Sequence, residues 1–222
     1  MIVSEFVRID ARQGRSTEPV RMGDAKLVHH NIILVSGNAP RAGKSTVAKA
    51  LCNFWGSKCY ETHDPIYRVA YGLCWDGKRD NRGRKLLQDI GLAGKTYDPD
   101  IWARKLYLDI FHATDKDLNI KTHGSGPDNW YFVSIVAGIR SVAEMEFFKN
   151  HSNNCCSVIV TRDDDIVNKK ASKHKVENML PPIGSFDYEI QNNMTGIDKL
   201  VEDTNEVAGR ILNEWKEYSE HE

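Results

Sequence analysis

The sequence predicts an α/β fold built on a central parallel sheet. Apolar runs of strand length alternate along the chain with segments of helical spacing, as in folds whose strands are covered by helices on both faces. One of these runs leads into a loop of small residues that is followed at once by a helical pattern. The 222 residues, 41% of them hydrophobic, suffice for one globular domain with a continuous core. We expect this domain over 31–222, behind an N-terminal extension over 1–30.

In the first half of the chain, an apolar run at 31–36 predicts the first strand, and helical spacing after the loop predicts a helix over 46–55. A short strand over 58–62 and a helix over 66–73 follow, separated by an Asp-Pro break. The polar, basic stretch 76–85 is expected to be a solvated loop or part of a phosphate site, and it leads into a helical segment over 86–90. Pro99 at a first-turn position starts a helix that runs to Phe111.

In the second half, the glycines and prolines of 120–129 predict a loop. The apolar runs at 131–136 and 156–161 are typical of buried parallel strands, with a helix over 141–149 between them. A short strand over 188–192 and a long helix over 197–218 close the domain. The alternation of strands and helices therefore predicts three layers, with helices on both sides of the sheet.

The segment from Gly37 to Thr46 has the features of a phosphate-binding loop. Small residues let successive backbone N–H groups turn toward a polyphosphate, Lys44 reaches its β- and γ-phosphates, and Ser45 offers a hydroxyl to Mg²⁺. Five residues instead of the usual four separate Gly37 from Gly43. Asn38 therefore takes the usual position of the first glycine, where an asparagine would tolerate a positive φ. A chance match in a surface turn is the alternative. The predicted nucleotide contacts are Asn38, Arg41, Ala42, Gly43, Lys44, Ser45 and Thr46.

Charge and cysteine content limit the classes of partner. A net charge of −1 and a pI near 6.7 give no general attraction to nucleic acid or to a membrane surface. The five cysteines lack the spacing of a zinc site, so we expect reduced, core-packing thiols in a cytoplasmic protein. No segment is long and apolar enough to predict a membrane partner. The oligomeric state stays open, with a homodimer as one candidate.

Several segments, in order over about residues 31–212, resemble the monophosphate kinases that bacteriophages encode to phosphorylate deoxynucleoside monophosphates. The pairs Arg140 with Glu144 and His174 with Glu177 belong to this pattern, as does Arg162. The longer pieces are Gly43-Lys44-Ser45-Thr46, Asp64-Pro65-Ile66, Arg84-Lys85-Leu86-Leu87-Gln88-Asp89-Ile90-Gly91, Asp98-Pro99-Asp100-Ile101-Trp102 and Phe186-Asp187-Tyr188-Glu189-Ile190-Gln191-Asn192.

This resemblance implies a P-loop kinase fold that transfers a phosphoryl group from Mg-ATP to a nucleotide in the cytoplasm, the host's cytoplasm if a phage encodes the chain. Lys44, Asp64 and Arg140 would be catalytic, with Ser45 at the metal. Arg140 follows a strand, where open α/β sheets bind ligands, and its alternative is a surface arginine. Asp64 could instead cap a helix.

The resemblance also assigns residues to the acceptor and to a lid. Arg84 and Gln88, four residues apart on one helix face, would bind the acceptor's phosphate and base. Trp102 would stack on the base or else pack as a core aromatic, and Arg104 is a further phosphate candidate. A mobile lid is expected over about 162–177, with Arg162 at the donor phosphates, against the alternative of a charged surface loop.

One departure from the family pattern widens the choice of function. The family places Asp-x-Arg after the middle strand, where the acid organises Mg²⁺, but this chain has Gly138-Ile139-Arg140. The acceptor could therefore be a hydroxymethylpyrimidine base in phage DNA, with the basic stretch on the DNA backbone. An ATP-binding regulatory protein that transfers no phosphate is the alternative from another class.

Overall fold

The computed structural model describes residues 28–121, 130–162, 180–193 and 196–219. Most of the expected N-terminal extension, the expected lid over 162–177 except Arg162, and most of the loop predicted over 120–129 lie outside these ranges. Among the described residues, no helix is long and apolar enough to cross a membrane.

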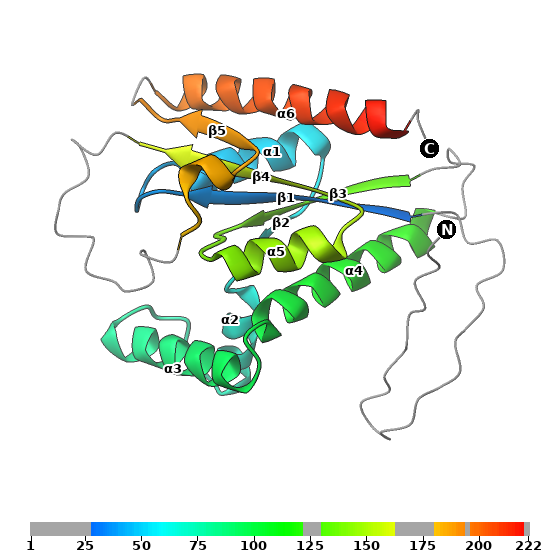
Figure 1. The fold of residues 1–222 in the computed structure, drawn as a ribbon. Coiled ribbons are helices and arrows are strands. Elements are labelled where there is room, and N and C mark those ends of the chain that lie inside the picture. The colour runs from blue at the N-terminus through cyan, green and yellow to red at the C-terminus, as the bar shows by residue number, and fades with distance from the viewer. Residues whose placement is uncertain (1–27, 122–129, 163–179, 194–195, 220–222) are drawn as a thin grey trace.

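A parallel five-stranded sheet forms the middle layer, with strand order β2-β3-β1-β4-β5 (Figure 1). The central strand pairs with β3 on one side and β4 on the other, so that Ile33 lies opposite Ile135 and Cys156. Such strands are buried on both faces, which explains their continuous apolar runs. The strands are β1 (Val28–Gly37), β2 (Cys59–Glu61), β3 (Trp130–Ala137), β4 (Asn154–Thr161) and β5 (Tyr188–Gln191).

Helices cover both faces of the sheet and complete the three predicted layers. On one face, α1 (Lys44–Trp55) packs beside α6 (Ile197–Ser219). On the other face lie α4 (Ile101–Lys121) and α5 (Val142–His151). Successive residues of β1 alternate between the two cores, since Ile33 packs with the residues of α1 and α6 while Ile32 packs with those of α4 and α5. The α/β prediction is confirmed.

Two helices extend away from the sheet, and the second of them carries the acceptor candidates Arg84 and Gln88. They are α2 (Asp64–Gly72) and α3 (Asn81–Tyr97), which pack on each other and on α4 (Figure 1). Asp80 caps α3, because its carboxylate accepts a hydrogen bond from the Gly83 amide over 2.8 Å. The expected loop over 76–85 is therefore wrong for its second half, which is helical.

The other element predictions are confirmed in type, and most ends differ by a few residues, although the helical segment predicted over 86–90 extends over Asn81–Tyr97. The largest shift is in α4, which extends to Lys121 instead of ending at Phe111. Its start also differs: Asp98 accepts a hydrogen bond from the Asp100 amide in the turn around Pro99, and the helix begins after that turn. The hydrogen bond to the Asp98 side chain thus favours a turn at Pro99 over the start of a helix there.

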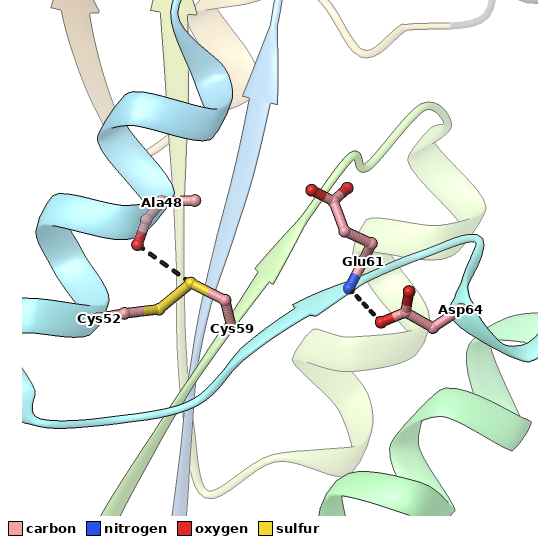
Figure 2. Close-up of a disulfide and its surroundings, with 5 residues drawn as sticks. All are labelled: Ala48, Cys52, Cys59, Glu61 and Asp64. Carbon is pink, nitrogen blue, oxygen red and sulfur yellow. Dashed lines mark hydrogen bonds between the residues drawn. A yellow bond between two sulfur atoms is a disulfide. The ribbon is translucent and has the colours of Figure 1, made fainter.

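The expectation of reduced thiols is wrong for two cysteines. Cys52, near the end of α1, forms a disulfide with Cys59, the first residue of β2 (Figure 2). A tight turn between helix and strand brings their Cα atoms to 6.1 Å, within the range a disulfide needs. Linear spacing gives no sign of this approach. Cys74, Cys155 and Cys156 are free thiols, as predicted, but the expectation of core packing is wrong for Cys74, which is exposed.

Candidate nucleotide-binding and phosphotransfer site

The loop between β1 and α1 departs from helical and extended geometry at two residues. Arg41 has a φ of 63° and Gly43 a φ of 109°, both in the left-handed region. Asn38, which we expected to take this conformation, does not, so that prediction is wrong. The turn in which the Ala42 amide donates to the Ala39 carbonyl places the left-handed residue three positions later than expected.

The loop is packed tightly against the end of the sheet. Asn192, at the end of β5, donates its side-chain amide to the Ala42 carbonyl over 2.9 Å. A Cβ atom on Gly43 would lie 2.9 Å from the Leu200 side chain, and one on Gly37 would lie 2.6 Å from the Lys44 side chain. Only glycine fits at these close approaches. Lys44 therefore folds back over the loop's first glycine.

The start of α1 is built to bind an anion. Gly43 is its N-cap and offers no side chain to the first turn, and that turn contains no acidic residue. The backbone N–H groups and positive end of such a helix attract phosphate. Ser45 is exposed at the same end of the helix. These features suit a phosphate group, and the Ser45 hydroxyl is accessible beside it.

Acidic groups lie beside the phosphate-binding loop at the end of β2. Asp64 accepts a hydrogen bond from the Glu61 amide over 2.8 Å (Figure 2). The N-cap of α2 is His63 and not Asp64, which is the first helical residue, so the alternative role of Asp64 as a cap is wrong. Its carboxylate instead fixes the backbone of the strand end that carries Glu61.

The Glu61 carboxylate lies next to Gly138, the position at which the family pattern has an acid. A Cβ atom built on Gly138 would lie 3.2 Å from the Glu61 Oε2 atom. Gly138 also has a φ of 89°, a conformation that side chains disfavour. The carboxylate therefore reaches this point from the neighbouring strand.

The pKa directions of this cluster show which charges surround it. Burial raises the pKa of Glu61, with a further increase from Asp64, while Lys44, Arg140 and Arg79 oppose the shift. Burial also lowers the pKa of His63. The charges of Arg79 and Arg140 lower it further, whereas the charge of Asp64 opposes the shift. The Glu61 carboxyl group and the His63 imidazole thus lie among the charges of Lys44, Arg79 and Arg140.

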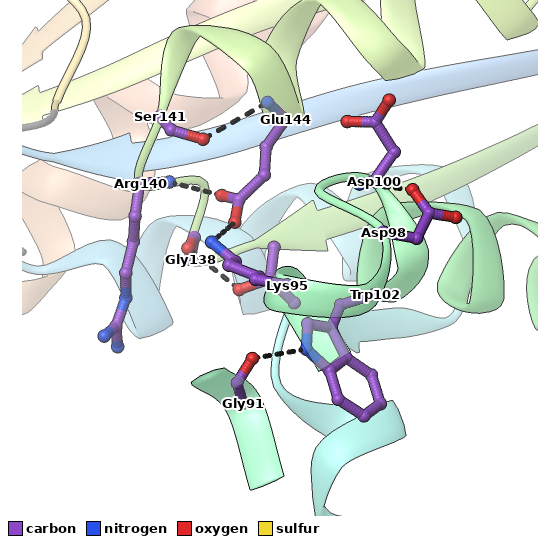
Figure 3. A network of polar contacts seen from close by, with 10 residues as sticks. Gly91, Lys95, Asp98, Asp100, Trp102, Gly138, Arg140, Ser141 and Glu144 are labelled. Carbon is purple, nitrogen blue, oxygen red and sulfur yellow. Dashed lines mark hydrogen bonds and ion pairs between the residues drawn. The ribbon is translucent and has the colours of Figure 1, made fainter. Parts of the chain in front are cut away.

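Arg140 follows β3 and is held through its backbone. The Ile139 carbonyl accepts a 2.7 Å hydrogen bond from the Ser36 hydroxyl, and the Arg140 amide donates to Glu144 over 2.9 Å. Glu144 also pairs with Lys95 at 3.2 Å, which connects the end of α3 to this turn (Figure 3). The Arg140 side chain is exposed and extends away from this network.

A cavity of about 550 Å³ unites the two halves of the predicted site. It brings together donor-side Lys44, acceptor candidates Arg84 and Gln88, and Arg140, as the sequence predicted. Its lining residues are Gly37, Asn38, Ala39, Pro40, Lys44, Tyr67, Arg79, Arg84, Leu87, Gln88, Ile139, Arg140 and Leu180.

Two predicted acceptor residues do not line this cavity. The Trp102 indole lies between α3 and α4, where its Nε1 atom donates to the Gly91 carbonyl over 2.9 Å (Figure 3). A Cβ atom on Gly94 would lie only 2.4 Å from this ring. Arg104 pairs with Asp98 at 2.6 Å. The structure thus favours the packing alternative for Trp102 over base stacking.

Arg79 and Tyr67 line the cavity but were not named individually as site residues in the sequence prediction. The Arg79 guanidinium lies over the Tyr67 ring, 5.0 Å from its centre, and approaches the His63 Nε2 atom at 3.4 Å. Tyr67 lies one turn after Asp64, so its position on α2 could have suggested that it faces the site. Arg79 belongs to the basic stretch before α3, where several arginines were equally plausible.

Few groups among the described residues could bind a metal ion directly. No group of three or more His, Cys, Asp or Glu side chains among the described residues could hold a metal ion. Mg²⁺ at phosphate sites keeps several waters and binds substrate oxygens with one or two protein groups. Ser45 and Glu61 are the candidates here.

Similarity to known proteins is weak and confined to solved structures. No protein-family model matches the chain, and no curated protein matches its sequence. A putative kinase from Chloroflexus aurantiacus J-10-fl has a similar structure, with a TM-score of 0.48 and 12% identity over 86% of this chain and 98% of that chain. A gluconokinase from Sinorhizobium meliloti 1021 gives 0.45 and 12% over 85% and 97%. A shikimate kinase from Aquifex aeolicus VF5 gives 0.39 and 13% over 82% and 98%. Because these TM-scores are below 0.5, we base the functional proposal on the residues of this chain.

Proposed function

We propose that this protein transfers the γ-phosphoryl group of Mg-ATP to a deoxynucleoside monophosphate. The observation that carries this proposal is the single cavity lined by Lys44 of the phosphate-binding loop, by Arg84 and Gln88 of α3, and by Arg140. Phosphoryl transfer requires mainly that donor and acceptor are aligned and that charge on the migrating group is neutralised. Donor and acceptor candidates face one space here.

The donor would bind along the loop and the start of α1. Backbone N–H groups and Lys44 would hold its phosphates, and Ser45 would contact the metal. Mg-ATP supplies the phosphoryl group when bound. Arg162 is a further donor-side candidate, because its Nη1 atom donates to the Arg41 carbonyl over 3.4 Å at the rim of the loop.

The acceptor would bind between α2 and α3. Arg79, Arg84 and Arg140 line the cavity and give it a positive charge suited to a phosphate-bearing acceptor. Gln88 lies one turn after Arg84, so a guanidinium that holds the phosphate and an amide that reads a base would act from one helix face. In this proposal Tyr67 takes the aromatic position that the sequence gave to Trp102.

Arg140 and Glu61 would serve the transfer step itself. Arg140 would bind the migrating phosphoryl group, where its fixed charge stabilises the transition state. Glu61, with Asp64 behind its backbone, would orient water around the metal in place of an acid at Gly138. This reading accounts for the departure from the family pattern without a change of reaction.

One observation keeps a second acceptor under consideration. The side chains of Lys78, Arg82 and Lys85 are exposed at and before the start of α3 and could contact a nucleic acid backbone, although Arg82 and Lys85 line a separate cavity. The alternative function is therefore phosphorylation of a hydroxymethylpyrimidine base in DNA. A third candidate, an ATP-binding protein that transfers nothing, would not need Arg84, Gln88 and Arg140 around the donor loop.

The experiment measures ADP release from Mg-ATP with five free monophosphates (dTMP, dGMP, dCMP, dAMP and 5-hydroxymethyl-dCMP), with DNA containing 5-hydroxymethyluracil, and without acceptor. We expect one or more free monophosphates to accelerate release. Lys44→Ala should remove that acceleration, whereas Lys49→Ala, at an exposed position of the same helix, should retain it. Acceleration by the DNA alone would replace the proposed acceptor, and binding of ATP without any acceptor effect would favour the regulatory alternative.

A further inference from the structure

The side chain of Asn38 makes a paired contact with the backbone of Arg162. Its Nδ2 atom donates to the Arg162 carbonyl over 3.2 Å, and the Arg162 amide donates to its Oδ1 atom, also over 3.2 Å. A carboxamide carries a carbonyl oxygen and an NH2 group in the same plane, so it can accept one hydrogen bond and donate another side by side. Asn38 therefore pairs with Arg162 in the manner of a neighbouring strand residue.

This contact continues the β1–β4 ladder beyond its last backbone pair. The register ends at Gly37 opposite Val160, and the Asn38 amide still donates to the Val160 carbonyl over 3.2 Å. The main chain then turns away into the phosphate-binding loop. The Asn38 side chain supplies the donor and the acceptor that the departing backbone no longer offers, which a glycine at this position could not do.

The residue held in this way is an arginine at the rim of the loop. Arg162 donates from Nη1 to the Arg41 carbonyl, while its Nε atom is buried without a hydrogen-bond partner among the described residues. A buried donor without an acceptor is unfavourable unless a ligand supplies one. Phosphate oxygens are strong acceptors for a guanidinium group.

We propose that Asn38 is a positioning residue that fixes the backbone of Arg162, so that its guanidinium group is directed to the phosphates of the bound donor. This inference rests on the proposed ATP site and goes beyond it, because it assigns a function to the asparagine that replaces the loop's usual glycine. It also makes an unusual prediction, since restoring that glycine should impair the site.

The test is a double-mutant cycle on the affinity for Mg-ATP, measured by calorimetry with the full chain. Asn38→Gly and Arg162→Ala should each weaken binding about tenfold, as expected for the loss of a charged hydrogen bond. The double variant should bind as weakly as Arg162→Ala alone, because Asn38 acts through Arg162. Asn53→Ala, which removes an exposed amide of α1, is the matched control and should bind ATP normally.

A second measurement detects the contact itself. Amide hydrogen exchange at Arg162 should be slow in the wild type and in Asn53→Ala, and clearly faster in Asn38→Gly. If Asn38→Gly does not fold, Asn38→Ala takes its place, because it also lacks the carboxamide.

The outcomes separate this inference from the proposed function. Wild-type protein that does not bind Mg-ATP would overturn the proposed function. Wild-type binding with an unaffected Asn38→Gly variant would overturn only the role of Asn38. Additive losses in the double variant would also overturn it, because they would show that Asn38 supports the loop independently of Arg162.

Discussion

The donor and acceptor sides of the cavity are held in different ways. The phosphate-binding loop is fixed by backbone contacts to the sheet, by the amide of Asn192 and by the buried side chain of Ala42, which is 1% exposed. On the acceptor side, α3 buries only Gly83 and exposes Arg84 and Gln88. The donor half is therefore part of the core, whereas the acceptor half depends on a few side-chain contacts between helices.

The largest expected effect is at the donor side. Lys44→Ala should lower kcat about 10³-fold, because it removes the cation next to the transferred group. Circular dichroism should remain that of the wild type, since the loop is held by other residues. Steady-state kinetics with the best acceptor measures the effect, and Lys49→Ala is the control. Undiminished turnover in a folded variant would contradict the loop assignment.

At the junction of the two sides, Arg140→Ala should lower kcat about 10²-fold and change the affinity for ATP much less. The reason is that its guanidinium is proposed to bind the migrating group, mainly in the transition state. Comparison of kcat with the Kd of ATP measures the split, and Arg210→Ala on α6 serves as the matched arginine control. An unchanged kcat would remove Arg140 from the mechanism.

Introducing the acid of the family pattern at position 138 should not improve the site. Gly138→Asp introduces a side chain at a φ of 89° and beside the Glu61 carboxylate. Strain of this kind costs about 1–3 kcal/mol, so Tm should decrease and activity should not rise. Gly138→Ala, measured in parallel by thermal unfolding, separates the strain from the charge. A more active Gly138→Asp variant would show that Glu61 does not serve as the replacement.

Weakening the contact between α3 and α4 should affect the acceptor side and leave the donor side unchanged. Trp102→Phe removes the hydrogen bond to Gly91 and leaves an aromatic ring, which should cost about 1 kcal/mol and lower Tm by about 2–4 °C. The KM for the acceptor should rise while the Kd of ATP is unchanged, because only α3 loses a contact. An equal change in ATP affinity would indicate that the two sides are not supported independently.

The smallest expected effect is on the thermal stability of a Glu61 variant. Its pKa is raised in the folded protein, so ionisation of Glu61 destabilises the fold. This cost is absent below the unfolded pKa of about 4.3, develops as the pH rises from there to the folded value, and is fully present above it. Glu61→Gln should therefore raise Tm at pH 7, by up to a few degrees, and lose this advantage near pH 4. Thermal unfolding across this pH range, with exposed Glu146→Gln as control, provides the measurement. A lower Tm for Glu61→Gln at pH 7 would contradict the assigned cost.

The donor side was predictable from sequence because its residues are contiguous. Small residues, Gly43 and Lys44 appear within one loop, and the strand before and helix after them are set by local periodicity. Even here the left-handed residue was misplaced, because Arg41 adopts that conformation through a turn that residue type alone does not specify. The amide contact from Asn38 to Arg162 spans 124 positions and has no local signal.

The acceptor side was only partly predictable. The helical spacing of Arg84 and Gln88 placed them correctly on one face, but the packing of Trp102 against Gly94 depends on how α3 and α4 meet. Glu61 was missed because the family pattern directed attention to position 138. Its place at the end of β2 was a usable signal, since ligands bind beyond the carboxyl ends of parallel strands.

The contact between Gly94 and Trp102 has a consequence for sequence divergence. Because the indole occupies the space that a Cβ atom on Gly94 would need, neither position can change freely without the other. Homologous chains that carry a larger residue at the position of Gly94 should have a smaller side chain at that of Trp102. We expect the two positions to vary as a pair, while Leu92, an exposed residue of α3, varies independently.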